Sequence, residues 1–133
     1  MIEPQDLIGR LRRQFHGGAL RRLPRNPADA DLLMALAVAQ LDPDASHEES
    51  EINLHLGAWL NGIAADDGPD YVTLRRNLVD CGFLRRSSDG VIYRVRPERI
   101  DAVLSPAAKS VDARAVLETI EMERDERREA FRS

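Results

Sequence analysis

The sequence predicts an α+β fold in which helices come first and a β-hairpin follows. Segments 28–41, 47–62 and 69–81 each carry apolar residues at helical spacing. Two runs rich in β-forming residues then flank a turn at 87–90 that contains Asp89-Gly90, a strong hairpin signal. Three helices followed by a hairpin is the element order of a winged helix-turn-helix. We therefore expect a winged-helix core of three helices and a β-hairpin wing, with extra N- and C-terminal helices.

The first two helices are predicted from their apolar residues. Segment 4–15 has a single apolar face, and the glycine pair Gly17-Gly18 ends that helix. This face consists of Leu7, Ile8, Leu11 and Phe15. Segment 28–41 is apolar nearly all round, which indicates a helix buried at the centre of the domain.

Capping residues mark the later helices. Ser46 is a good N-cap for segment 47–62. Pro69 suits the first turn of segment 69–81. A last helix is predicted over 112–131, where apolar residues again follow helical spacing among many charges.

The predicted elements form a single domain spanning residues 1–133, since this length fits one core. We expect an N-terminal helix and linker over 1–18, a winged-helix core over 19–100, and a C-terminal linker and helix over 101–133.

The composition is that of an ordinary soluble protein, with 32% charged and 43% hydrophobic residues. No apolar run approaches the roughly 20 residues that a membrane span needs. The first residues lack the basic flank and apolar stretch of a signal peptide. The single cysteine, Cys81, cannot form an internal disulfide. We expect a cytoplasmic protein that does not contact membranes.

The net charge of −4 conceals a strong segregation of charge along the chain. Segment 42–70 holds eight acidic residues and no Lys or Arg, whereas segment 71–100 holds seven arginines and three acidic residues. A phosphate backbone responds to local rather than overall charge. Segment 71–100 is therefore the candidate surface for binding nucleic acid.

The two adjacent arginines of helix 69–81 are expected to have different roles. At about 100° per residue, Arg75 falls within the apolar arc of this helix and Arg76 falls on the opposite side. A buried guanidinium needs a carboxylate partner. We predict an internal, structural ion pair between Arg75 and Glu49 of the preceding helix, with Glu51 as the alternative partner.

The outward side of helix 69–81 carries residue types that hydrogen-bond base edges or phosphate. The predicted DNA-binding residues are Thr73, Arg76 and Asn77 on the helix and Arg85, Arg86, Arg94 and Arg96 on the hairpin. Neighbours in a strand point to opposite faces, so only about half of the hairpin arginines can share a side with Arg76. Asp80 lies on the same side and opposes binding. This pattern predicts a DNA-binding transcriptional regulator that uses helix 69–81 and hairpin 83–96.

Catalysis is not expected. Cys81 falls on the apolar face of its helix without a neighbouring base, and a buried thiol is usually inert. The three histidines, His16, His47 and His55, are scattered without the spacing of zinc ligands. We therefore expect no enzyme activity, no cofactor and no metal site.

The two terminal helices each carry an apolar stripe, which predicts a homodimer formed through them. The alternative is that both helices fold back on their own domain. An alternative function also stays open, namely a protein-interaction or accessory module with a winged-helix fold that binds no nucleic acid. Its surfaces would be the acidic segment 42–70 and the amphipathic ends.

Several short motifs together resemble the bacterial domain-of-unknown-function 2087 family over about residues 16–96. The motifs are Leu23-Pro24-Arg25, Glu49-x-Glu51-Ile52-Asn53, Asp70-Tyr71-x-x-Leu74-Arg75-Arg76-x-Leu78-Val79-Asp80, Gly82-Phe83-Leu84-x-Arg86, Asp89-Gly90 and Tyr93. Members of this family occur alone or appended to helix-turn-helix regulators, so the resemblance implies a link to transcription. The family pattern includes Glu49 and Arg75. This chain departs from it at 26–29, which is not basic, and at His47, where the family has an aromatic residue.

Overall fold

The computed structural model describes residues 1–132, and within them it contains seven helices and three strands. The helices are α1 (Pro4–Gln14), α2 (Pro27–Val38), α3 (Glu49–Leu60), α4 (Tyr71–Asp80), α5 (Pro97–Val103), α6 (Pro106–Lys109) and α7 (Ala113–Arg132). The strands are β1 (His47–Glu48), β2 (Leu84–Arg86) and β3 (Ile92–Val95). The predicted α+β class is confirmed.

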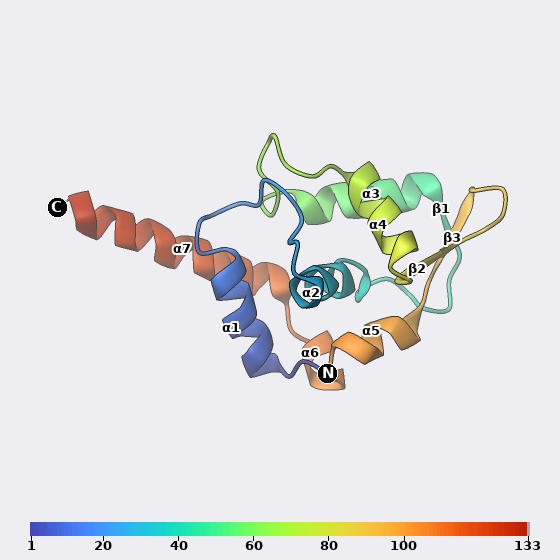
Figure 1. The fold of residues 1–133 in the computed structure, drawn as a ribbon, viewed down its shortest axis with the longest axis horizontal. Coiled ribbons are helices and arrows are strands. Elements are labelled where there is room, and N and C mark those ends of the chain that lie inside the picture. The colour runs from blue at the N-terminus through green and yellow to red at the C-terminus, as the bar shows by residue number, and fades with distance from the viewer. Residues whose placement is uncertain (133) are drawn as a thin grey trace.

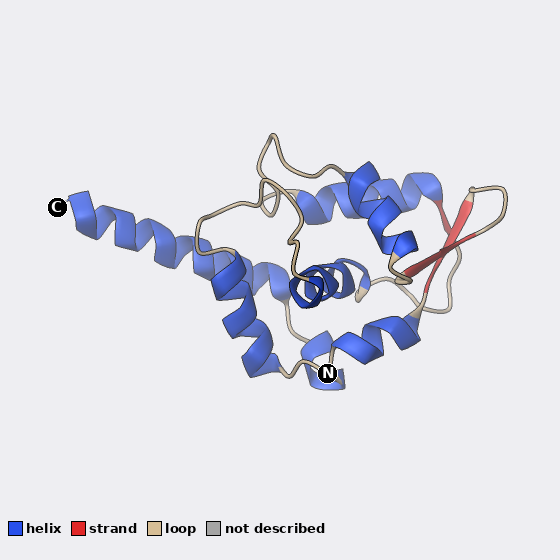
Figure 2. Ribbon diagram, in the orientation of Figure 1, coloured by secondary structure: helices blue, strands red, loops and turns tan. Residues whose placement is uncertain are grey.

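The strands form one antiparallel sheet in the order β1-β3-β2, so the β2–β3 hairpin is extended by a strand from before α3. The sheet lies at one end of the molecule, and the helices occupy the rest (Figure 2). The C-terminal part of α7 extends away from the body at the opposite end (Figure 1).

The core is built around α2, which lies in the middle of the molecule (Figure 1). Every residue from Leu32 to Val38 is buried, as expected for a helix that is apolar all round. The terminal helices join this same core through Leu7 and Leu11 of α1 and Ile120 of α7.

The prediction that helix 47–62 begins after Ser46 is wrong. His47 and Glu48 form β1 and pair with Tyr93 and Ile92 of β3. The backbone N–H of Glu49 also donates to the carbonyl of Val91. These hydrogen bonds hold His47 and Glu48 in extended conformation, so Glu48 is the N-cap of α3.

The start of α4 also differs from the prediction, because Pro69 precedes the helix instead of occupying its first turn. Asp70 is the N-cap, and its carboxylate accepts a hydrogen bond from the backbone N–H of Thr73 at 2.8 Å. At the other end Gly82 has φ +82°, the left-handed conformation that favours glycine after a helix.

Two short helices that were not predicted, α5 and α6, follow the hairpin; α5 begins inside the predicted core 19–100 and ends in the predicted linker that starts at 101. The first residue of each is a proline, Pro97 in α5 and Pro106 in α6. Ile100 and Val103 of α5 are buried in the core. Helices of seven and four residues are too short to show a clear apolar period.

We expect Asp70→Ala to lower the urea midpoint of unfolding at pH 7, because α4 loses its N-cap, whereas Asp70→Asn keeps a capping side chain. The hydrogen bond from the Thr73 backbone holds the pKa of Asp70 below its usual value. A lowered pKa stabilises the fold above the pKa of the unfolded state, about 3.9, and that contribution is lost as the pH falls through the folded-state pKa.

The difference between the wild type and Asp70→Ala should therefore shrink below about pH 4, while the difference between Asp70→Asn and Asp70→Ala should persist. Urea titrations followed by tryptophan fluorescence from pH 7 to pH 3 measure both differences. Equal midpoints for all three proteins at pH 7 would show that Asp70 does not cap α4.

Candidate nucleic-acid interface

Arg75 connects α4 to α3 through two polar contacts. Its Nη1 lies 3.0 Å from Oε1 of Glu49 and also donates to Oδ1 of Asn53. The side chain of Arg75 is 14% exposed and that of Glu49 is 41% exposed. The structure therefore contains the ion pair between Glu49 and Arg75, although at the edge of the core and not inside it.

The alternative partner, Glu51, instead lies beside His47, with 3.6 Å between its Oε2 and the His47 Nδ1. Within the motif Glu49-x-Glu51-x-Asn53, the first and last residues contact Arg75, whereas the middle one lies beside His47. Sequence reasoning assigned no role to Asn53. Its position four residues after Glu49, one turn further along the same helical face, is the signal that could have found it.

With Arg75 turned toward α3, the neighbouring Arg76 is exposed on the surface of α4. Thr73 and Asp80 are also exposed, whereas Asn77 is only partly so. Within residues 1–132, no hydrogen bond or ion pair holds the Arg76 side chain. The outward side of α4 therefore presents Arg76 and Thr73 to solvent, with Asn77 less accessible.

The register of the hairpin brings two of its arginines together. Arg85 of β2 lies directly opposite Arg94 of β3, and both are exposed. Directly opposite residues point to the same face of a sheet, with Cβ atoms about 4.5–5.5 Å apart. Glu48 is also exposed on this face, opposite Ile92, but it is not within 4.0 Å of either guanidinium.

The other two hairpin arginines are placed differently. Arg86 lies opposite Tyr93, whose side chain is buried on the core face, and its guanidinium packs over Gly90 in the turn. Arg96 forms an ion pair with Glu98, with 3.1 Å between Nε and Oε1. Arg86 and Arg96 are exposed, but neither lies beside Arg85 and Arg94. We refer to that pair of opposite arginines as the Arg85–Arg94 cluster.

Arg99 also has a structural role, although no site prediction included it. Its Nη2 lies 3.1 Å from Oδ1 of Asp31, and its guanidinium lies 4.4 Å from the centre of the Phe83 ring. Pairing thus accounts for three of the seven arginines in segment 71–100. The four with no carboxylate within 4.0 Å, among the described residues 1–132, are Arg76, Arg85, Arg86 and Arg94.

The prediction that Cys81 lies on a buried face is wrong, because Cys81 is exposed. It is the C-cap of α4, where the backbone leaves helical geometry, so the helical spacing that placed it among apolar residues does not apply. Partial burial of the thiol raises its pKa, and the Asp31 carboxylate acts in the same direction. A raised pKa lowers the thiolate fraction at neutral pH.

Residues 1–132 contain no group of three or more His, Cys, Asp or Glu side chains that could hold a metal ion. Within that range, no helix is both long enough and apolar enough to cross a membrane.

The profile of a bacterial family described as an uncharacterized protein conserved in bacteria, DUF2087, matches residues 19–95. The chain belongs to the DUF2087 family. The matched DUF2087 region contains α2, β1, α3, α4, β2 and β3, so the Glu49–Arg75 contact and the Arg85–Arg94 cluster both lie inside it. No curated protein and no solved structure matches the chain.

Truncation of the two adjacent arginines should separate their roles. Arg75→Ala removes a charged hydrogen bond and leaves Glu49 and Asn53 without a partner, so we expect a loss of about 1–2 kcal/mol in the free energy of unfolding. Arg76→Ala removes an exposed side chain and should change this free energy by less than about 0.5 kcal/mol. Urea unfolding of both variants gives the comparison, and equal losses would contradict the assignment.

Proposed function

We propose that this DUF2087 protein is a DNA-binding transcriptional regulator whose interface is formed by α4 and the β2–β3 hairpin. The observation that carries the proposal is the Arg85–Arg94 cluster, a pair of exposed arginines directly opposite each other with no carboxylate within 4.0 Å in the described chain. A bound phosphate is the ligand that this arrangement fits best.

The reason is electrostatic. Like charges directly opposite in a sheet destabilise the pair of strands, so the hairpin carries both arginines at a cost in stability. A phosphate between them reverses the sign of this interaction. Guanidinium groups suit this ligand, because their planar N–H donors bind phosphate oxygens in pairs.

The topology also supports this proposal. We infer a winged helix from the element order α2-β1-α3-α4-β2-β3 together with the sheet order β1-β3-β2. In a helix-turn-helix protein the second helix enters the major groove, and here α4 has that place. The connection 61–70 is longer than the tight turn of a simple helix-turn-helix. It is fixed to the body by backbone hydrogen bonds between Leu20 and both Ile63 and Ala65.

Each predicted residue then has a distinct role in the proposal. Arg76 and Thr73 on α4 contact base edges, and Asn77 does so less because it is partly covered. Arg85 and Arg94 bind the phosphate backbone. Arg86 and Arg96 add positive charge at the margin, where Glu98 offsets part of it.

Replacing both cluster arginines should weaken DNA binding and its salt dependence. Against a pool of genomic fragments in a mobility-shift assay, Arg85→Ala/Arg94→Ala should reduce the slope of log K against log salt by about 2, since each lost phosphate contact removes about one. The matched control is Arg13→Ala/Arg22→Ala, which removes the same charge from exposed arginines away from the hairpin. Control and wild type should bind alike.

Two results would defeat the proposal. One is the absence of any shifted fragment at low salt, which would favour the alternative of a protein-interaction module. The other is equal weakening by the cluster variant and its charge-matched control, which would show that binding follows net charge alone.

Arg76→Ala tests the base-reading role separately. We expect discrimination among sequences to fall by about 1–3 kcal/mol, because a bidentate arginine contact with a base is lost, while the salt slope changes little. Competition between selected and random fragments measures this. Selectivity equal to that of the wild type would remove α4 from the interface.

We further propose that the protein forms a weak homodimer through α7 alone. The apolar face of α1 is covered by its own chain, since Leu7 and Leu11 are fully buried. Beyond Ile120, α7 has no buried residue up to 132, and Phe131 is 95% exposed. The end of this helix extends away from the body (Figure 1), although nearer to Ile120 the Glu123 side chain forms an ion pair with Arg12 of α1.

Four charged residues of α7 beyond Ile120 are self-complementary. Glu121, Asp125, Arg128 and Arg132 are spaced by four, three and four residues, so they lie on one helical face. An antiparallel two-fold pair of helices would place Glu121 opposite Arg132 and Asp125 opposite Arg128 of the second copy. Exposed ion pairs contribute little each, so the dimer should be weak and sensitive to salt.

Charge reversal tests this arrangement. Arg128→Glu/Arg132→Glu should be monomeric in sedimentation equilibrium at concentrations where the wild type dimerises. Mixing it with Glu121→Arg/Asp125→Arg should restore a dimer, because the opposite charges then face each other. A wild type that stays monomeric at low salt, or a mixture that does not associate, would contradict the proposal.

A further inference from the structure

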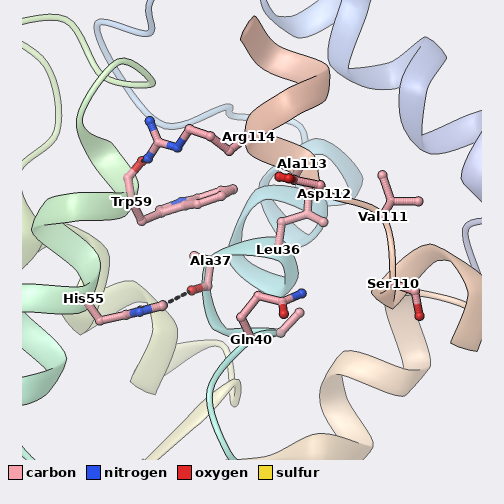
Figure 3. A pocket seen from close by; sticks show the side chains of 11 residues that line it. Leu36, Ala37, Gln40, His55, Trp59, Ser110, Val111, Asp112, Ala113 and Arg114 are labelled. Carbon is pink, nitrogen blue, oxygen red and sulfur yellow. Dashed lines mark hydrogen bonds between the residues drawn. The ribbon is translucent and has the colours of Figure 1, made fainter.

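A cavity of about 400 Å³ lies between α2, α3 and the segment that joins α6 to α7. Figure 3 shows its lining side chains, which come from all three of these regions. None of them belongs to the proposed DNA interface. The volume is within the range of about 300–1,000 Å³ that is typical of small-molecule sites.

The inner part of the cavity is apolar. Leu36 and Ala37 of α2 and Ala113 of α7 are buried and form its floor. Trp59 of α3 supplies an aromatic wall, and its indole ring extends toward Leu36 and Ala113 (Figure 3). An aromatic wall over an aliphatic floor favours a planar, apolar ligand.

Most polar groups at the cavity are already engaged within the chain. His55 Nε2 lies 2.7 Å from the carbonyl oxygen of Ala37. The guanidinium of Arg114 donates to the carbonyls of Ala58, Trp59 and Asn61 at the C-terminal end of α3. These bonds use three of the five N–H donors of Arg114 and direct its guanidinium at the end of α3.

The groups that remain define the ligand's polar end. Gln40 donates through Nε2 to the Lys109 carbonyl, which leaves its amide oxygen as an acceptor. Asp112 uses one carboxylate oxygen to cap α7 at Ala115, which leaves the other. Gln40 and Asp112 are both exposed, so these acceptors stand at the mouth of the cavity.

We propose that this cavity binds a small, uncharged aromatic molecule that carries an N–H donor. Its ring packs against Trp59 over the apolar floor, and its N–H donates to Gln40 or Asp112 at the mouth. The Asp112 carboxylate disfavours an anionic group at the mouth, because the Arg114 guanidinium is directed at the carbonyls at the end of α3 and not at the mouth. This proposal does not rest on the proposed DNA interface.

The test uses N-phenylnaphthylamine, a neutral aromatic amine whose fluorescence rises in apolar surroundings and whose absorption overlaps tryptophan emission. Trp59 is the only tryptophan of the chain, so energy transfer from it reports binding to the protein, and the cavity-filling variant below locates the site. Saturable transfer with the wild type is expected. Ala39→Phe, which fills the cavity from its partly exposed α2 side, should weaken binding about tenfold or more.

The matched control is Ala102→Phe, the same change at an exposed alanine of α5 outside the cavity, which should bind like the wild type. Circular dichroism checks that both variants fold, and Val111→Phe at the cavity mouth replaces Ala39→Phe if that variant does not. Absence of transfer from Trp59, or equal binding by the filled and control variants, would overturn the proposal.

The charge preference is tested with the sulfonated analogue, anilinonaphthalene sulfonate. The wild type should bind it about tenfold more weakly than the neutral amine, because of the Asp112 carboxylate. Asp112→Asn keeps a capping side chain and removes the charge, so it should narrow this difference. Equal affinity of the wild type for both probes would refute the assigned role of Asp112.

Discussion

The contact of Arg75 with Glu49 and Asn53 determines what the surface of α4 presents. Adjacent residues of a helix differ by about 100° in direction, so the rotation that turns Arg75 toward α3 also turns Arg76 into solvent. Leu74 and Leu78 are buried by the same rotation. A fixed polar contact at one position thus orients an apolar face and a polar face together. Both partners of Arg75 lie on α3, one turn apart, so the contact fixes the orientation of α4 relative to α3.

The arginines of segment 71–100 show why net charge is a poor guide to function. Arg75 and Arg99 serve the fold, since each bridges to an acidic residue of another helix. Arg85 and Arg94 have no such partner, and the β2–β3 register places them side by side. The same residue type is therefore a structural contact at some positions and an unneutralised charge at others. Only the local arrangement, and not the overall charge of −4, distinguishes the two.

The sequence predicted the long elements because their patterns are long. Helical spacing predicted α1 to α4 and α7, and the dipeptide Asp89-Gly90 predicted the hairpin. β1 was missed because two residues show no alternation, and its extended form depends on pairing with Tyr93 and Ile92, far along the chain. Cys81 was misplaced because the helical period was extended past the end of α4. From the sequence, only about half of the hairpin arginines were expected on any one face of the sheet, because neighbours in a strand point to opposite faces. Which two share a face depends on the register, and no local pattern encodes it.

α3 lines the proposed cavity and also contacts α4, the helix of the proposed DNA interface. Its first two turns supply Glu49 and Asn53 to Arg75. Its last turn supplies Trp59 to the cavity, and three carbonyls near its end accept hydrogen bonds from Arg114. A helix of twelve residues is about 18 Å long, so the Arg75 contact and the Trp59 wall of the cavity lie near opposite ends of α3. A change at the cavity that shifts α3 along its axis would act directly on the contact that orients α4. One physical connection between the cavity and α4 therefore runs through α3, a helix whose two ends are each fixed by an arginine from another element.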